Sequence, residues 1–172
     1  MIEEVTIQDM MTCRDRRVEL QNDLLERFKG NPVLSFCLNI PGPVKTDPEI
    51  KAAFLAGKDD ILSVLSGNCW DISGEYEIHE KTGDEWIASI CADSDSLKKQ
   101  MCEIEDKSSL GRIFDIDVLT PDGRKLSREK YRTCLICNRQ AQECARSRRH
   151  TAVELFRKVK ELIQEDQTSK TE

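Results

Sequence analysis

The chain has 172 residues, of which 34% are charged and 38% hydrophobic, and its net charge is −6. These values are typical of a charge-rich globular domain and exclude a disordered chain, while the acidic balance argues against a general nucleic-acid binder. No stretch approaches the roughly 20 apolar residues of a membrane span, and the start lacks a signal-peptide pattern. We therefore expect a cytoplasmic protein with no membrane or nucleic-acid partner.

The first half of the chain predicts two helices, a buried strand and a hairpin. Apolar residues recur at helical spacing after Thr6, a suitable N-cap, and Gly30 ends that helix. An apolar run typical of a buried strand stops at Pro41-Gly42-Pro43. The expected elements are a helix over 7–29, a strand over 33–40, a helix over 47–65, and two strands over 70–78 and 86–92.

The second half combines shorter helices with one strand. The expected elements are a helix over 94–106, a strand over 112–119, a short helix over 127–130 and a helix over 150–163, and no clear period runs through 133–149. Hairpin and crossover spacings both occur, so we predict an α+β fold with a mixed sheet and flanking helices. One catalytic domain is expected over 1–164 and a flexible polar tail over 165–172.

The strand expected over 112–119 carries two acids in alternation with apolar residues. Asp115 and Asp117 point to the same face, about 7 Å apart along the strand. Two such carboxylates repel each other, and a bound Mg²⁺ relieves that repulsion. The pattern is typical of nucleotidyltransferase-like metal sites. An ordinary half-exposed strand produces the same alternation, so the pattern alone leaves both interpretations open.

Basic charge gathers in the segment that follows. Residues 124–149 hold nine Lys or Arg against two Glu, a net charge of +7, whereas the other residues have a net charge of −13. Arg146, Arg148 and Arg149 stand directly before the predicted helix that begins near His150. Guanidinium groups and free N–H groups at a helix start suit a polyphosphate. A solvated basic patch is the alternative.

Two further groups of polar residues flank the buried strand. The chain leaves this strand through a rigid turn, which Asn39 precedes and Lys45 follows. Gly42, within the turn, would let a ligand approach the backbone closely. A stiff connection without a ligand is the alternative. The arginines of the first helix are interpreted as a solvated face; they are Arg14, Arg16 and Arg17.

The chain has eight cysteines, and the first five are scattered singly, as expected for small buried residues. The other three differ. Cys134 and Cys137 form a Cys-x-x-Cys pair, and Cys144 and His150 follow, which supplies the donors of a tetrahedral Zn²⁺ site. Their spacing is not that of a standard zinc finger, so buried thiols or a redox pair are the alternatives.

Four of these segments, taken together, are similar to segments of a known protein family. The segments are Asn-Ile-Pro-Gly-Pro-Val-Lys at 39–45, Gly-Arg-Ile-Phe-Asp-Ile-Asp-Val at 111–118, Cys-Leu-Ile-Cys at 134–137 and Cys-Ala-Arg-Ser-Arg-Arg-His-Thr at 144–151. In order and spacing they resemble the apo-citrate lyase phosphoribosyl-dephospho-CoA transferase family, the citrate lyase holo-ACP synthases. The resemblance covers nearly the whole chain.

This resemblance implies a nucleotidyltransferase-type enzyme. A serine of the apo acyl carrier protein, the γ subunit of citrate lyase, would attack the α-phosphate of 2'-(5''-triphosphoribosyl)-3'-dephospho-CoA, and diphosphate would leave. Asp115 and Asp117 would hold Mg²⁺, and His150 would act as a base or a phosphate contact. The substrate would be bound by Asn39, Lys45, Arg112, Arg146, Arg148 and Arg149. The third carboxylate of the wider nucleotidyltransferase pattern has no assigned position.

Other classes of function remain as alternatives. One is a zinc-stabilised or basic-patch module that docks an acidic carrier protein without catalysis. Another is the analogous transferase of malonate decarboxylase, which uses the same prosthetic group.

Overall fold

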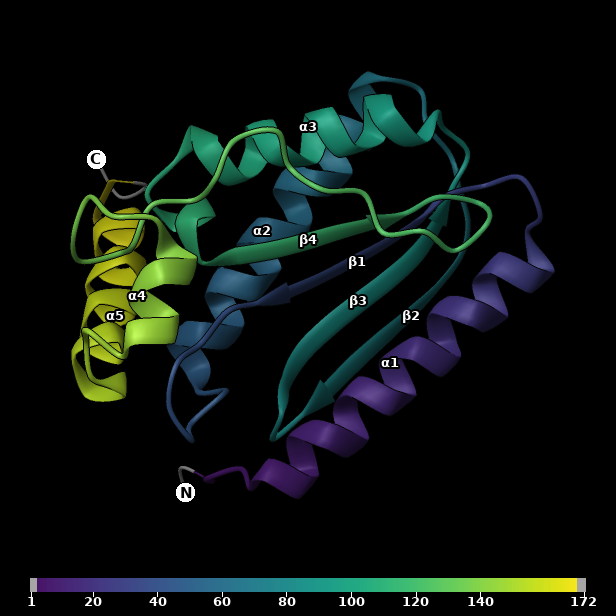
Figure 1. Ribbon diagram of the computed structural model, residues 1–172. Helices are drawn as coiled ribbons and strands as arrows, with labels where there is room; N and C mark the ends of the chain where they lie inside the picture. The colour runs from purple at the N-terminus through teal and green to yellow at the C-terminus, as the bar shows by residue number, and fades with distance from the viewer. Residues whose placement is uncertain (1–2, 170–172) are drawn as a thin grey trace.

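The computed structural model describes residues 3–169, which form a four-stranded sheet and five α-helices (Figure 1). The strands are β1 (Val33–Leu38), β2 (Ile72–Glu80), β3 (Gly83–Ile90) and β4 (Phe114–Leu119). They lie in the order β2-β3-β1-β4. No helix within residues 3–169 is long and apolar enough to cross a membrane.

The predicted α+β class is confirmed, but the sheet is antiparallel throughout and not mixed. The crossover spacing in the sequence belongs to β3, the helix α3 (Ser94–Lys107) and β4. β3 and β4 run in the same direction, yet they do not pair, because β1 lies between them and runs the opposite way. Every ladder is therefore antiparallel. Whether the fold is nucleotidyltransferase-like stays a prediction.

One face of the sheet is covered by α1 (Ile7–Arg27). The expected N-cap is confirmed: the Thr6 side chain accepts a hydrogen bond from the Asp9 N–H, and the Asp9 carboxylate accepts one from the Thr6 N–H. Such a reciprocal cap satisfies two otherwise free N–H groups. Leu24 then packs against Val33 and Ile87 on the sheet.

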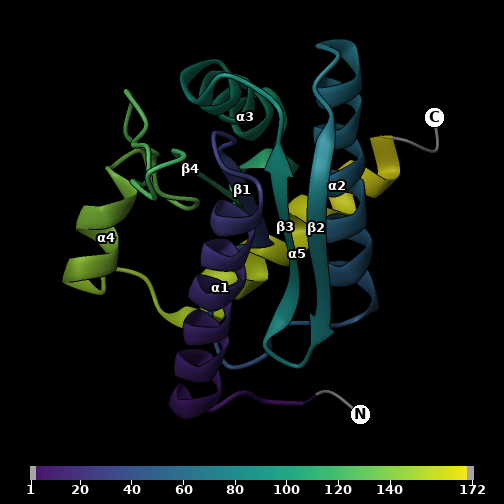
Figure 2. The same ribbon diagram turned by 90° about the vertical axis from the view of Figure 1, so that its right-hand side faces the viewer.

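The other face carries the main core, beneath α2 (Pro48–Gly67), α3 and α5 (Ala152–Ser169). Figure 2 shows α1 and α2 on opposite sides of the sheet. The ring of Phe36 stacks on that of Phe54 with centroids 5.0 Å apart and meets the edge of Phe114 at 5.4 Å. Gly57 permits this approach, because a Cβ there would lie 2.6 Å from Phe36.

Alternation along β4 decides where its acids lie. Phe114, Ile116 and Val118 are buried in the main core. Because successive side chains of a strand point to opposite faces, Asp115 and Asp117 project on the α1 face. The main hydrophobic core therefore lies on one face of the sheet, and the two acids of β4 lie on the other.

Several element boundaries differ from the predictions. The strand expected over 112–119 begins at Phe114, because Leu110–Ile113 forms a 3-10 turn. The short helix expected over 127–130 is wrong, since that segment is an irregular loop held against α3. A seven-residue helix, α4 (Ala141–Ser147), occupies the stretch without a clear period. α5 continues past its expected end to Ser169, through the first part of the proposed tail; residues 170–172 lie outside the described residues.

Candidate active site

A row of side chains crosses the sheet on the α1 face. In the strand register, Cys37 at the centre pairs with Asp115 on one side and with Glu85 on the other. The Cys37 Sγ lies 3.9 Å from Asp115 Oδ2. Burial, followed by repulsion from Asp115, raises the pKa of the Cys37 thiol to about 12. Cys37 is therefore protonated at neutral pH and is unsuited to act as a nucleophile.

The two acids of β4 lie in different environments. Burial raises the pKa of Asp115, and repulsion from Asp117 raises it further; Lys125, Arg132 and Arg17 partly offset both effects. Asp117 is paired with Lys125, whose Nζ lies 2.7 Å from Asp117 Oδ2. Asp115 and Asp117 therefore repel each other, and a bound cation relieves repulsion of this kind.

The sequence suggested that Arg17 of α1 belongs to a solvated face, but the structure makes it part of the site. Its Nε lies 2.6 Å from Glu85 Oε2, and the Cys13 thiol donates to the other carboxylate oxygen over 2.6 Å. The Glu85 side chain is only 3% exposed, so this carboxylate is fully engaged. The preceding residue, Arg16, lies at the edge of the site, where it pairs with half-exposed Glu80.

Between α1 and the sheet lies a cavity of about 170 Å³ that Asp115 and Glu85 help to line. Two cations, Arg14 and Lys45, line the same cavity. Burial lowers the pKa of Lys45, and repulsion from Arg14 lowers it further. Lys45 Nζ donates to the Ile40 carbonyl oxygen over 2.6 Å, but neither cation forms an ion pair within residues 3–169. Two cations without carboxylate partners suit an anionic ligand.

A second, larger cleft of about 820 Å³ begins on the far side of Asn39, which lines both spaces. Arg112 lines this cleft and donates from Nη2 to the Cys134 carbonyl oxygen over 2.8 Å. The rim also includes Tyr131, which is 78% exposed, and Arg148. A basic cleft with an exposed ring has the features that bind nucleotide-like molecules.

The floor of this cleft contains a buried acid that the sequence analysis missed. Glu105 is 4% exposed, and its Oε1 accepts a hydrogen bond from the Ile116 N–H over 3.0 Å. Burial raises the pKa of Glu105, and Arg132, that same N–H, Lys98 and Arg128 partly offset the effect. Arg132 Nη2 lies 3.3 Å from Glu105 Oε1, and Arg128 Nε lies 3.5 Å from Glu105 Oε2. Glu105 thereby ties the basic loop to α3.

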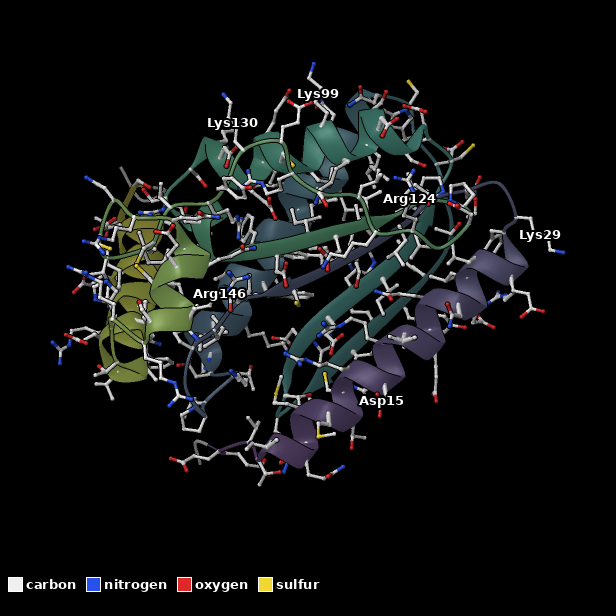
Figure 3. All side chains as sticks on the ribbon, in the orientation of Figure 1. Asp15, Lys29, Lys99, Arg124, Lys130 and Arg146 are labelled. Atoms are coloured by element: carbon white, nitrogen blue, oxygen red, sulfur yellow. The ribbon has the colours of Figure 1, made fainter. Side chains whose placement is uncertain are left out.

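The arginine triplet lies at the end of α4, not at the start of α5. Arg146 is in α4, Arg148 follows it in a left-handed conformation with φ of 47°, and all three arginines are exposed. Figure 3 shows Arg146 on α4. The start of α5 is closed by a capping box in which Glu154 accepts the Thr151 N–H over 2.7 Å. The capping box engages the N–H groups of Thr151 and Glu154, and the use of the remaining N–H groups of this helix start together with the arginines stays a prediction.

His150 does not join the carboxylates. Its Nε2 lies 3.4 Å from Cys137 Sγ, within a cluster that also contains Cys134 and Cys144. The predicted site residues therefore do not form one group. Asp115 and Lys45 line the smaller cavity, Arg112, Arg148 and His150 line the large cleft, and Asn39 lines both. Asp117, Arg146 and Arg149 line neither space.

The missed residues carried only weak signals in the sequence. Arg17 and Glu85 are an ordinary helix arginine and an ordinary strand glutamate, and only the packing of α1 on β3 makes them partners. Glu105 falls at a helix position next to the apolar face. None of the three belongs to a local motif.

Comparison with known proteins matches the chain to one family. Residues 5–166 match the family described as apo-citrate lyase phosphoribosyl-dephospho-CoA transferase. Proteins named apo-citrate lyase phosphoribosyl-dephospho-CoA transferase from Escherichia coli O139:H28 and Shigella boydii serotype 18 are each 33% identical over 163 residues. Each alignment covers 92% of this chain and 88% of the relative.

Proposed function

Since this chain belongs to the apo-citrate lyase phosphoribosyl-dephospho-CoA transferase family, we propose how its site performs the reaction of that name. The protein is a transferase that attaches phosphoribosyl-dephospho-CoA to apo-citrate lyase. Membership of this family sets aside a docking module without catalysis, and the names of the relatives refer to citrate lyase and not to malonate decarboxylase. A cytoplasmic location stays a prediction.

The donor in our proposal is 2'-(5''-triphosphoribosyl)-3'-dephospho-CoA, and the acceptor is a serine hydroxyl of the acyl carrier (γ) subunit. The serine oxygen forms a bond to the α-phosphorus, the bond from that phosphorus to the bridging oxygen of the diphosphate breaks, and diphosphate leaves. The serine proton passes to a base on the enzyme. Such a transfer depends mainly on position and on charge stabilisation, so no side-chain nucleophile is needed.

The observation that carries this proposal is that Asp115 shares a cavity with Arg14 and Lys45, neither of which forms an ion pair within residues 3–169. The two cations suit the oxygens of a triphosphate, and Arg17 adds positive charge at the same wall. Asp115 is our candidate base. Asp115 lines this cavity, so a carboxylate oxygen that is not bound to Mg²⁺ would accept the serine proton there.

Asp115 and Asp117 also fit Mg²⁺. They are adjacent acids on one strand face whose mutual repulsion is only partly relieved by Lys125. Within residues 3–169, no third metal-binding side chain joins them. This matches the habit of Mg²⁺, which takes one or two protein carboxylates and completes its shell with phosphate and water. When bound there, the ion would neutralise charge on the phosphates.

The large cleft on the other side of Asn39 accommodates the dephospho-CoA part of the donor in this proposal. A volume of about 820 Å³ is of the size that binds a ligand of this kind. Arg112 and Arg148 would contact its phosphate groups, and Tyr131 offers a ring for stacking.

Release of diphosphate tests this arrangement. We expect release to require the donor, Mg²⁺ and apo-citrate lyase together, and Lys45→Met to raise the donor KM by roughly tenfold through the loss of one charge-assisted contact. Lys51→Met, which removes an exposed lysine from α2, is the matched control and should leave the KM unchanged. Release without acceptor, or an unchanged donor KM in Lys45→Met, would contradict the proposal.

A further inference from the structure

Four potential metal ligands meet where the segment 133–151 folds back on itself. They are Cys134, Cys137, Cys144 and His150, and their ligand atoms all lie within 4.8 Å of one another. We propose that these four side chains bind one structural Zn²⁺, which fixes the wall of the large cleft. The inference rests on the geometry of this cluster and is independent of the transfer reaction.

The distances match a tetrahedral site. The Sγ atoms of Cys137 and Cys144 are 3.4 Å apart, and His150 Nε2 is 3.4 Å from Cys137 Sγ. Zinc bonds of about 2.3 Å to sulfur and about 2.0 Å to nitrogen give tetrahedral edges of about 3.8 Å and 3.5 Å. A disulfide would need about 2.05 Å between the sulfurs, and all three cysteines are free.

Three local features of the backbone bring the ligands together. Hydrogen bonds from Cys134 N–H to the Arg139 oxygen and from Ala141 N–H to the Arg132 oxygen, both 2.8 Å, close a narrow hairpin around the Cys-x-x-Cys turn. α4 then presents Cys144 to that turn. The left-handed residue Arg148 reverses the chain after α4, and this reversal returns His150 to the cluster.

The surroundings are those of a closed, structural site. Cys134 and Cys144 are 5% and 7% exposed, and four protein ligands leave no position for water or substrate. Cys134 Sγ also accepts a hydrogen bond of 3.5 Å from the Ile136 N–H, a secondary contact that orients a ligand.

Local charge favours the metal as well. Zinc with three thiolates and a neutral histidine carries a net charge of −1, and the surrounding segment is rich in arginine. Arg146, Arg148 and Arg149 follow Cys144 closely in the chain and are exposed, so they add positive charge near this anionic site without occupying its ligand positions. In this assignment His150 is a zinc ligand and not the base.

The cluster also forms part of the cleft. Cys134, Cys144 and His150 line it, and the carbonyl of Cys134 holds Arg112. A redox pair would use two thiols and leave a third thiol and an imidazole without a role, whereas zinc uses all four groups. Binding energy at such sites contributes directly to folding, so the metal would hold this irregular segment in place.

Metal analysis of the full chain, purified without chelators, tests the proposal. We expect one zinc per chain, and its loss in Cys137→Ser; Cys91→Ser, which changes an exposed cysteine outside the cluster, is the matched control and should keep it. Replacement by Co²⁺ should give the charge-transfer bands of thiolate ligands and the visible bands of a tetrahedral site. No stoichiometric zinc in the wild-type chain, or a zinc content that Cys137→Ser leaves unchanged, overturns the proposal.

A second readout covers the case in which Cys137→Ser fails to fold. Trypsin should cut the wild-type chain within 128–149 faster after treatment with a zinc chelator, by at least roughly tenfold, because the segment then opens locally. Added Zn²⁺ should restore protection. Cleavage there that neither chelator nor zinc changes would contradict a structural role, whatever the outcome of the transfer assay.

Discussion

At the scale of single residues, the site contains side chains whose environment is unfavourable to folding. Asp115 is the clearest case, because burial and the neighbouring Asp117 both penalise its charged form. Strain of this kind is kept where function requires it. Substitutions at such positions separate function from stability.

Asp115→Asn should therefore abolish transfer while stabilising the fold. We expect a loss of at least roughly a hundredfold in kcat/KM and a rise in Tm of about 2 °C at pH 7, since the amide carries no buried charge. Thermal unfolding and a transfer assay measure the two effects. Asp60→Asn, an exposed acid of α2, is the control and should change neither.

The same carboxyl predicts the sign of a pH effect. A raised pKa means that, above the ordinary value of 3.8, the unfolded chain loses the proton while the folded chain keeps it. The contribution of Asp115 to stability is therefore neutral at low pH and becomes unfavourable as the pH rises toward its folded pKa. The gain in Tm for Asp115→Asn over wild type should grow from acid to neutral pH. A gain that shrinks over this range would contradict the assigned environment.

A matched pair of arginines tests the reinterpretation of α1. Arg17→Lys should destabilise the protein by about 2 kcal/mol, because a lysine cannot reproduce the guanidinium contact with buried Glu85. Arg16→Lys should cost less than about 0.5 kcal/mol, because its partner Glu80 is half exposed. Denaturant unfolding measures both. Equal effects would return Arg17 to the solvated face that the sequence suggested.

At the scale of elements, the irregular loop after β4 depends on α3. Arg128 and Arg132 approach the buried Glu105, and Arg128 Nη2 also lies 2.6 Å from Asp106. Glu105→Gln keeps the size of the side chain but removes the charge that Arg128 and Arg132 face, so we expect the loop to open locally and proteolysis within 124–132 to become faster. Glu103→Gln, on the exposed side of the same helix, is the control. If the two variants are cut at the same rate, the loop is held by other contacts.

Prediction from sequence worked best where local chemistry decides an element. Thr6 with Asp9, and Asp47 before Pro48, are caps whose partners lie within three residues, and both helices begin where expected. The strand β4 was found by its alternation, which also placed Asp115 and Asp117 on one face. The prediction of a short helix over 127–130 was wrong. The polar residues of this segment fit a helix pattern, but the segment is held by a partner on α3 that is distant in the sequence.

The candidate site was harder to predict because its parts meet through the sheet order. The sequence does not reveal that β1 lies between β3 and β4, and that order places Glu85 and Asp115 in one row. α4 was missed because only Cys144 in it is buried, which leaves no apolar period. The cysteine cluster was anticipated as one alternative from the Cys-x-x-Cys pair with a further cysteine and a histidine, although their spacing is not that of a standard zinc finger. Its closure around His150 depends on the turn at Arg148.

At the scale of the whole molecule, charge is distributed unevenly. The segment 124–149 has a net charge of +7 in a chain whose net charge is −6. Carrier proteins are commonly acidic, so we expect this segment to attract the acceptor. Arg146→Glu should raise the KM for apo-citrate lyase severalfold at low salt and less at high salt, because screening weakens the attraction. Lys29→Glu is the control, since Figure 3 shows Lys29 at the end of α1, far from Arg146.

The intact mass of the acyl carrier subunit of apo-citrate lyase, after incubation with this protein, Mg²⁺ and triphosphoribosyl-dephospho-CoA, tests the central claim most directly. We predict a mass gain of one phosphoribosyl-dephospho-CoA group, abolished by Asp115→Asn and retained by Asp60→Asn. No gain with a competent donor and acceptor, or an equal gain with Asp115→Asn, would contradict the assignment of the reaction to the acids of β4.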